Sequence, residues 1–234
     1  VGINNFYKNT PTCQAMKAAP LTYSLEDLWT CLNSDTTILN NYNAKFAMQF
    51  TQNNRFDFFF NGAEKVRNAR DASDLRPLET TYRQLGVTRS DLGSSWWKTG
   101  MPKTYKWSDR HIFSDRFMVE VSYAHIGNNF ALTFPEDSRR DVQPAFDIGT
   151  NAYARSYLES VYVRPTDSID VLGNYFIPGW LGGDHALKFG FKWRNDIAHS
   201  ETTYGGKTIA RFSSLATMAA SQAQMYRDSI TEYE

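Results

Sequence analysis

The sequence predicts an all-β protein, arranged as an antiparallel up-and-down meander of about six strands. Apolar and polar residues alternate with a period of two in several runs, which indicates strands with one apolar face. These runs occur in pairs joined by short turns, a pattern typical of β-hairpins. Aromatic residues form 15% of the 234 residues, and such side chains are enriched in strands.

The first hairpin is expected around a turn at 52–54. Every second residue from Tyr42 to Phe50 is apolar or aromatic on the incoming run, and the alternate positions are polar except for Ala47. The return run from Arg55 to Asn61 repeats this alternation with phenylalanines. Two runs with one apolar face, separated by a polar turn, predict a paired hairpin.

Two further hairpins are expected. The second surrounds a turn at 114–116, and its outgoing strand continues toward Phe134. The third surrounds a glycine-rich turn at 178–184, and its return strand from Leu187 to Trp193 has the clearest alternation in the chain. Three hairpins give the six predicted strands.

Long polar segments separate the hairpins, at 62–101 and 135–163. Connections longer than about 15 residues are uncommon in compact domains. Short turns at one end and long loops at the other are typical of outer-membrane barrels, which have short periplasmic turns and long extracellular loops. The pattern therefore favours a segment of a large transmembrane β-barrel as one architecture.

Alternation alone does not distinguish this barrel from a soluble β-sandwich. In a sandwich the apolar faces pack against each other and the polar faces meet water. In a transmembrane barrel the apolar face contacts lipid and the polar face lines the lumen. Aromatic residues near the expected strand ends suit the interfacial girdles of a barrel; they include Tyr42, Phe50, Tyr105, Trp107, Trp180 and Trp193.

Several segments, taken in order, resemble the barrel of TonB-dependent outer-membrane receptors. The resemblance is to the Oar-like group, which carries a carboxypeptidase-regulatory-like domain before the plug. It covers 39 to about 204 and rests on these stretches: 39–46, 52–55, 64–70, 76–80, 111–115 and 182–191.

The resemblance implies an internal fragment of a plugged barrel of about 22 strands. Such a receptor lies in the bacterial outer membrane and takes up a bulky ligand with energy from the TonB complex, which it contacts through a plug region absent from this sequence. Residues 1–38 are then an extracellular-type loop, 39–204 the barrel segment, and 205–234 another loop, partly helical or disordered. The implied partners are outer-membrane lipid, the TonB complex and an unknown imported ligand.

The receptor interpretation makes one set of apolar residues lipid-facing. These residues are Phe46, Met48, Phe58, Val119, Val121, Phe189 and Phe191. The alternative is a secreted soluble β-sandwich binding module, of adhesin or lectin type, in which the same residues form the core.

The sequence indicates no catalytic, cofactor or metal site, so we expect no enzyme. The four histidines have no metal-ligand spacing with the two cysteines, and neither a nucleophile elbow nor a phosphate-binding glycine loop occurs. Lysine plus arginine and aspartate plus glutamate both number 25, giving zero net charge. Whole-chain electrostatics therefore offers no case for nucleic acid as a partner.

Two features of the predicted loops are candidate sites. Cys13 and Cys31 are the only cysteines. A disulfide between them would stabilise the folded state by roughly 3 kcal/mol in the chain-entropy model. The candidate ligand-contact loop includes two arginines and two tryptophans, because aromatic side chains on outer loops supply contact area. These residues are Arg67, Arg70, Trp96 and Trp97. The alternatives are local ion pairs for the arginines and loop packing for the tryptophans.

Overall fold

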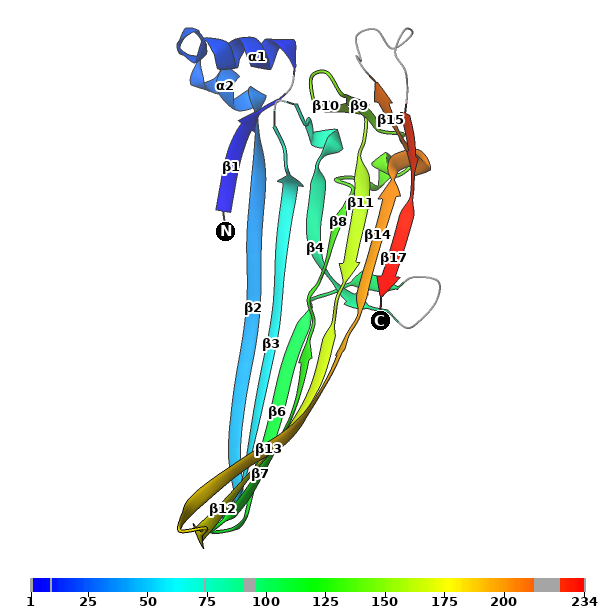
Figure 1. Cartoon of the computed structure of the whole chain (residues 1–234). Helices are drawn as coiled ribbons and strands as arrows, with labels where there is room; N and C mark the ends of the chain where they lie inside the picture. The colour runs from blue at the N-terminus through cyan, green and yellow to red at the C-terminus, as the bar shows by residue number, and fades with distance from the viewer. Residues whose placement is uncertain (1, 9, 74, 91–95, 213–223, 234) are drawn as a thin grey trace.

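A computed structural model shows an all-β, mostly antiparallel protein (Figure 1). It describes residues 2–8, 10–73, 75–90, 96–212 and 224–233. A 13-stranded sheet forms the body of the molecule, and a second sheet of four strands lies near one end. The body is long and narrow, with the helices and the second sheet at the end opposite the lowest turns.

The strands of the main sheet differ greatly in length. Their bounds are β1 Gly2–Tyr7, β2 Leu32–Thr51, β3 Asn54–Arg70, β4 Tyr82–Arg89, β5 Trp97–Thr99, β6 Lys103–Ser114, β7 Phe117–Ile126, β8 Asn129–Thr133, β11 Leu158–Val163, β12 Thr166–Trp180, β13 Gly183–Asp196, β14 Ala198–Tyr204 and β17 Ser229–Tyr233. The second sheet contains β9 Ala145–Asp147, β10 Ala152–Ala154, β15 Thr208–Phe212 and β16 Gln224–Arg227.

Helices are few and short. The α-helices are α1 Pro11–Ala18 and α2 Leu25–Cys31. Single turns of 3-10 helix occur at Pro20–Thr22, Leu78–Thr80, Asp137–Arg139 and Gly205–Lys207. Among the residues that the structure describes, no helix has both the length and the apolar composition to span a membrane.

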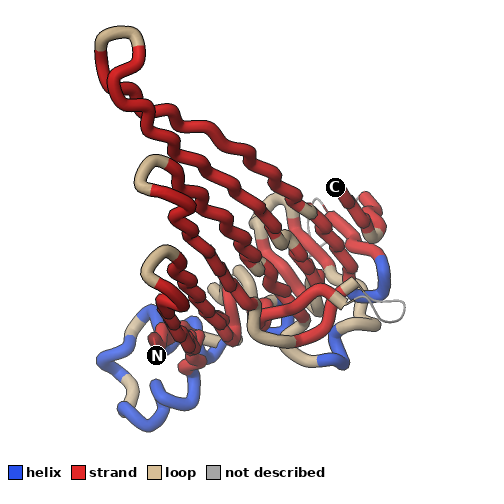
Figure 2. The backbone as a smooth tube through the Cα atoms, turned by 90° about the horizontal axis from the view of Figure 1, so that it is seen from below, coloured by secondary structure: helices blue, strands red, loops and turns tan. Residues whose placement is uncertain are grey.

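Three long hairpins have their turns near the predicted positions. The turns join β2 to β3, β6 to β7 and β12 to β13, and each leaves two residues between the strands. All three lie at the same end of the sheet, and Figure 2 shows them stepping along it. We call this end the turn side and the opposite end the loop side.

The predicted number of six strands is wrong. One reason is that long strands are interrupted: β7 and β8 are separated at Gly127, whose N–H donates to the Lys103 carbonyl at 2.8 Å, and β11 and β12 are separated at Pro165. The second reason is that the polar segments predicted as loops contain strands of their own. For example, β4 lies within 62–101 and β11 within 135–163.

Over the described residues, the main sheet is open and does not close into a barrel. Its strand order is β13-β12-β7-β6-β3-β4-β8-β11-β14-β17, with β1 and β2 continuing beyond β3 and β5 paired to β4. Both β4 and β6 pair with the same side of β3, β4 near Arg70 and β6 from Asn54 to Gly62. The turn-side half therefore has six adjacent strands, and the loop-side half continues them with shorter ones.

The segments outside the predicted barrel region contain regular structure. Within 1–38, where a loop was expected, α1 and α2 precede β2, which begins at Leu32 rather than at 39. Thr10 caps α1 by accepting from Cys13 N–H, and Ser24 caps α2 by accepting from Asp27 N–H. Within 205–234, where a partly helical or disordered loop is expected, the described residues form the strands β15, β16 and β17, and 213–223 lies outside the described residues.

The buried apolar core lies on the loop side. Val87, Ala131, Val161 and Val163 form it, and Trp97 packs against it. Burying one valine side chain contributes about 1.5–3 kcal/mol. This core fixes the shorter strands β4, β8 and β11 to one another, and with them the loops that they connect.

Candidate functional site

The register of the three hairpins places one apolar surface on six strands. One cross-strand row joins Phe46, Phe58, Trp107, Tyr123, Ile169 and Trp193. The next row toward the turns joins Met48, Phe56, Asp109, Val121, Val171 and Phe191. Directly opposite residues point to the same side of a sheet, so both rows belong to one surface, which we call the apolar face.

All seven residues predicted to face lipid lie on the apolar face. Five belong to the two rows above; Val119 and Phe189 are both paired with Gly173 in the following row. Phe191 is 63% exposed and Phe189 is 55% exposed, while Phe58, Val119 and Val121 are half-buried by their neighbours. The alternation of the sequence therefore places the set on one surface, without identifying what contacts it.

Phe189 lies directly over Gly173. A Cβ atom added to Gly173 would come within 2.4 Å of the Phe189 ring. The missing side chain therefore leaves the space that this ring fills. An aromatic ring paired with a cross-strand glycine is a known device for filling a gap in a sheet.

Aromatic residues concentrate at both ends of the apolar face. Toward the loop side, the Tyr105 and Trp107 rings lie 6.1 and 6.2 Å from the Tyr123 ring. Toward the turn side, the Phe117 ring lies 5.3 Å from that of Phe113 and 6.0 Å from that of Tyr175. Two aromatic clusters thus lie toward opposite ends of the apolar face.

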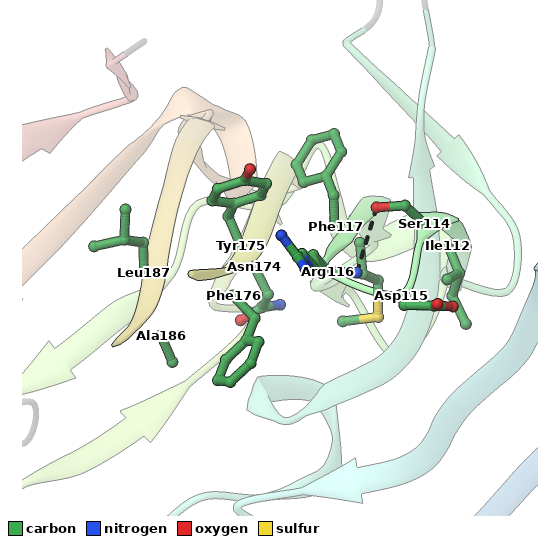
Figure 3. A pocket seen from close by; sticks show the side chains of 11 residues that line it. Ile112, Ser114, Asp115, Arg116, Phe117, Asn174, Tyr175, Phe176, Ala186 and Leu187 are labelled. Carbon is green, nitrogen blue, oxygen red and sulfur yellow. Dashed lines mark hydrogen bonds between the residues drawn. The ribbon is translucent and has the colours of Figure 1, made fainter. Parts of the chain in front are cut away.

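A cavity of about 310 Å³ opens beside the second turn. Figure 3 shows its lining, in which Phe117 and Tyr175 point to one side and Phe176 to the other. The cavity forms where β12 and β13 extend past the β6–β7 turn, and Phe176 N–H donates to the Arg116 carbonyl there at 2.8 Å. We assign no ligand to this shallow site.

The opposite face of the same strands is mainly polar, although Phe59 and Leu172 also lie exposed on it. Arg110 pairs with Glu120 at 2.7 Å across β6 and β7, and Lys192 lies 3.3 Å from Asp170 across β12 and β13. These pairs are exposed, so each contributes little to stability. They make this face suited to water, in contrast with the apolar face.

A few polar residues interrupt the apolar face, and they bind one another. The Asn54 amide donates to both oxygens of Asp109, at 2.9 and 3.1 Å. Tyr123 donates to Asp167 at 2.6 Å, and His125 Nδ1 lies 2.9 Å from the same oxygen. These contacts reduce the cost of placing the two carboxylates beside apolar side chains.

The predicted ligand-contact loop does not form a single site. Arg67 donates to both oxygens of the buried Asp35, and these hydrogen bonds raise the pKa of the Arg67 guanidinium. Arg70 donates to Gln84 at 2.8 Å. The described contacts do not join these two arginines to the tryptophans.

The two tryptophans pack against the loop side of the sheet. The Trp96 ring stacks on His199 at 4.6 Å, and Trp97 covers the valine core. Arg89 lies 5.2 Å above the Trp96 ring. In the structure both tryptophan rings therefore pack against the protein itself. Their contact with a ligand stays a prediction.

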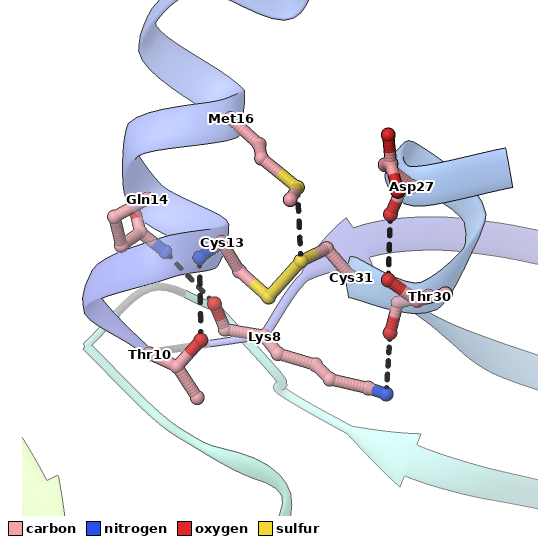
Figure 4. Close-up of a disulfide and its surroundings, with 8 residues drawn as sticks. All are labelled: Lys8, Thr10, Cys13, Gln14, Met16, Asp27, Thr30 and Cys31. Carbon is pink, nitrogen blue, oxygen red and sulfur yellow. Dashed lines mark hydrogen bonds between the residues drawn. A yellow bond between two sulfur atoms is a disulfide. The ribbon is translucent and has the colours of Figure 1, made fainter. Parts of the chain in front are cut away.

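The structure joins Cys13 and Cys31 in a disulfide between α1 and α2 (Figure 4). Both cysteines are buried, and the Met16 sulfur lies 3.4 Å from Cys31. Lys8 donates to the Thr30 carbonyl at 2.7 Å, which connects β1 to the end of α2. The bond thus holds a small helical cap at the loop end of β2.

Sequence reasoning missed an arginine surrounded by three tyrosines. The Arg76 guanidinium lies 5.1, 4.6 and 4.4 Å from the rings of Tyr82, Tyr153 and Tyr157. Burial raises the pKa of Tyr82 and of Tyr157, so both remain neutral beside the cation. The rings come from distant segments, and no local pattern in the sequence marks them.

A second missed contact is the ion pair between Arg140 and Glu159. The guanidinium donates to both carboxylate oxygens, at 3.0 and 3.1 Å, and Glu159 is almost fully buried. These hydrogen bonds raise the pKa of Arg140. The Arg76 and Arg140 contacts both hold connecting segments against the loop side of the main sheet.

Within the described part of the chain, no group of three or more His, Cys, Asp or Glu side chains is placed to hold a metal ion. Comparisons with protein-family models, with curated proteins and with solved structures find no match.

Proposed function

We propose that this chain forms part of the wall of a TonB-dependent outer-membrane receptor, acts without catalysis, and serves the uptake of a bulky ligand. The apolar face contacts outer-membrane lipid and the polar face lines the lumen. The observation that carries the proposal is the contrast between these faces on the same six strands. Phe191 is 63% exposed, whereas its neighbour Lys192 forms an ion pair on the opposite face.

The dimensions of the apolar face support this proposal. Along β6 the stretch from Tyr105 to Phe113, with the residues of both aromatic clusters included, spans nine residues. A transmembrane strand needs about 9–11 residues, and aromatic girdles border the apolar band of outer-membrane barrels. The aromatic clusters therefore mark the two membrane surfaces in the proposed arrangement.

The partners follow from the same arrangement. Outer-membrane lipid covers the apolar face, the TonB complex acts through the plug of the whole receptor, and the imported ligand meets the loop side. The competing function, a soluble β-sandwich module, needs a second sheet over the apolar face. Among the described residues, the four-stranded second sheet lies at the loop side instead.

Site-specific labelling tests this proposal. Phe191→Cys and Lys192→Cys place a fluorescent label on neighbouring positions that point to opposite faces of β13. We expect a nitroxide-bearing lipid to quench the label at 191 after the chain is mixed with phospholipid vesicles. An aqueous quencher should act mainly on the label at 192, and labelling at Ser108 on β6 provides a second polar-face control.

Two outcomes would contradict the proposal. Equal aqueous quenching at 191 and 192 would mean that the apolar face meets water. Shielding of 191 from both quenchers, by a chain that stays monomeric without detergent, would favour the soluble module with that face packed inside.

A further inference from the structure

A cavity of about 690 Å³ lies at the loop-side border of the apolar face. Its size is within the range of about 300–1,000 Å³ that is typical of ligand sites. Tyr105, Tyr123 and Asp167 line its floor, and their cross-strand register places them on the apolar face. The hairpin of β4 and β5 supplies the opposite wall through Arg89 and Lys98.

The cavity has an excess of positive charge. Arg89, Lys98 and Lys103 line it, and all three are exposed. Asp167 is the acidic residue of the lining, and its carboxylate already accepts from Tyr123 and contacts His125. Three cations facing one engaged carboxylate favour an anionic occupant.

The surroundings of the cavity favour an amphiphile. The row of residues immediately toward the turns contains Trp107, Ile169 and Trp193, which begin the apolar face. The Tyr105 ring stacks on His125 at 4.9 Å, so an aromatic wall connects the charged cavity to the apolar surface. A molecule that fills both regions has an anionic head and a hydrocarbon tail.

We propose that this cavity binds the phosphate-bearing headgroup of a membrane lipid, whose acyl chains lie along the apolar face. This inference rests on the proposed membrane placement, because the same border is where lipid headgroups would lie. Lys98 and Lys103 hold the phosphate, with Arg89 as the third cation. Tyr105 and Tyr123 line the cavity at headgroup depth, where such aromatic side chains are enriched.

The test uses the whole chain and phosphatidylcholine vesicles that contain a small fraction of phosphatidic acid. Vesicle flotation measures insertion, and native mass spectrometry measures which lipid remains bound after extraction. The variant is K98Q/K103Q, which leaves Arg89 on the Trp96 ring. The matched control is K106Q/K188Q, which removes two exposed lysines from the opposite face.

We expect all three proteins to float with the vesicles. The wild type and the control should retain phosphatidic acid in preference to phosphatidylcholine. The preference of the K98Q/K103Q variant for phosphatidic acid should fall about thirtyfold, because two cations that each contribute about 1 kcal/mol near an anionic lipid are removed.

Three outcomes would overturn the inference. Unchanged preference in a K98Q/K103Q variant that floats normally would remove the headgroup site and leave the membrane placement intact. Displacement of the lipid by an equal concentration of inorganic phosphate would identify a free-anion site. Failure of the wild type to float would overturn both the headgroup site and the proposed function.

Discussion

Apolar residues are buried on the loop side of the main sheet and exposed on the turn side. On the loop side, Val161 and Val163 of β11 are fully buried under Trp97. On the turn side, Phe189 and Phe191 of β13 are more than half exposed. The difference teaches that alternation identifies an apolar face, whereas burial depends on whether another part of the molecule covers it.

The largest expected effect comes from a charge in the covered half. Val163→Asp places a carboxylate at a fully buried position and should destabilise the fold by about 3–5 kcal/mol. Denaturant unfolding in detergent micelles measures this loss. Val171→Asp is the matched change in the turn-side half, where the side chain is half-buried and meets detergent or lipid in the proposed arrangement: it should cost less than Val163→Asp in micelles and impair vesicle insertion. Equal losses at both positions would remove the contrast between the halves.

Phe189→Arg tests the uncovered half inside a bilayer. An arginine that faces lipid near the midplane costs about 2–4 kcal/mol, so insertion into vesicles should fall. Lys188→Arg on the opposite face is the control and should insert like the wild type. Normal insertion of the Phe189→Arg variant would argue against lipid contact at this surface.

Removing the disulfide should act on the loop side alone. The double change of Cys13 and Cys31 to serine should cost up to roughly 3 kcal/mol and increase proteolysis within α1 and α2. Labels on the β12–β13 hairpin should keep their quenching pattern. Reduction of the wild type supplies the comparison, and a change of the hairpin labels on reduction would show that the two halves are coupled.

Arg76→Met should give the smallest of these effects. It removes the cation from three tyrosine rings and should cost about 1–2 kcal/mol, since a desolvated cation–π contact contributes about that much. The matched control is Arg116→Met in the exposed second turn. Thermal unfolding measures both variants, and equal melting temperatures would show that the tyrosine contacts contribute nothing.

The sequence predicts the turn-side half well, because its information is local. Alternation from Tyr42 to Phe60 specifies both the β2–β3 hairpin and the side on which its rings lie. The structure confirms an all-β, mostly antiparallel chain on this basis. The same reasoning places the seven candidate lipid-facing residues on one face, although their contact with lipid stays a prediction.

The loop-side half could not be predicted in this way. Its short strands β4 and β11 are held by neighbours far along the chain, such as Leu85 opposite Ala131 and Val161 opposite Glu201. The tyrosines around Arg76 are likewise brought together by tertiary packing. Period-two patterns contain no signal for such contacts, which explains why long loops were expected where short strands occur.

The borders of the turn-side half determine how it can associate. β1 pairs with β2 from Leu32 to Thr37, and β13 pairs with β12 at one end of the strand order. Among the described residues, the outer edge of β2 beyond Thr37 and the outer edge of β13 therefore have no strand partner. Backbone groups left unpaired in hydrocarbon each cost several kcal/mol. In a membrane, the two unpaired edges therefore need neighbouring strands to satisfy their backbone hydrogen bonds. In water, the same edges favour pairing with other copies of the chain and hence aggregation.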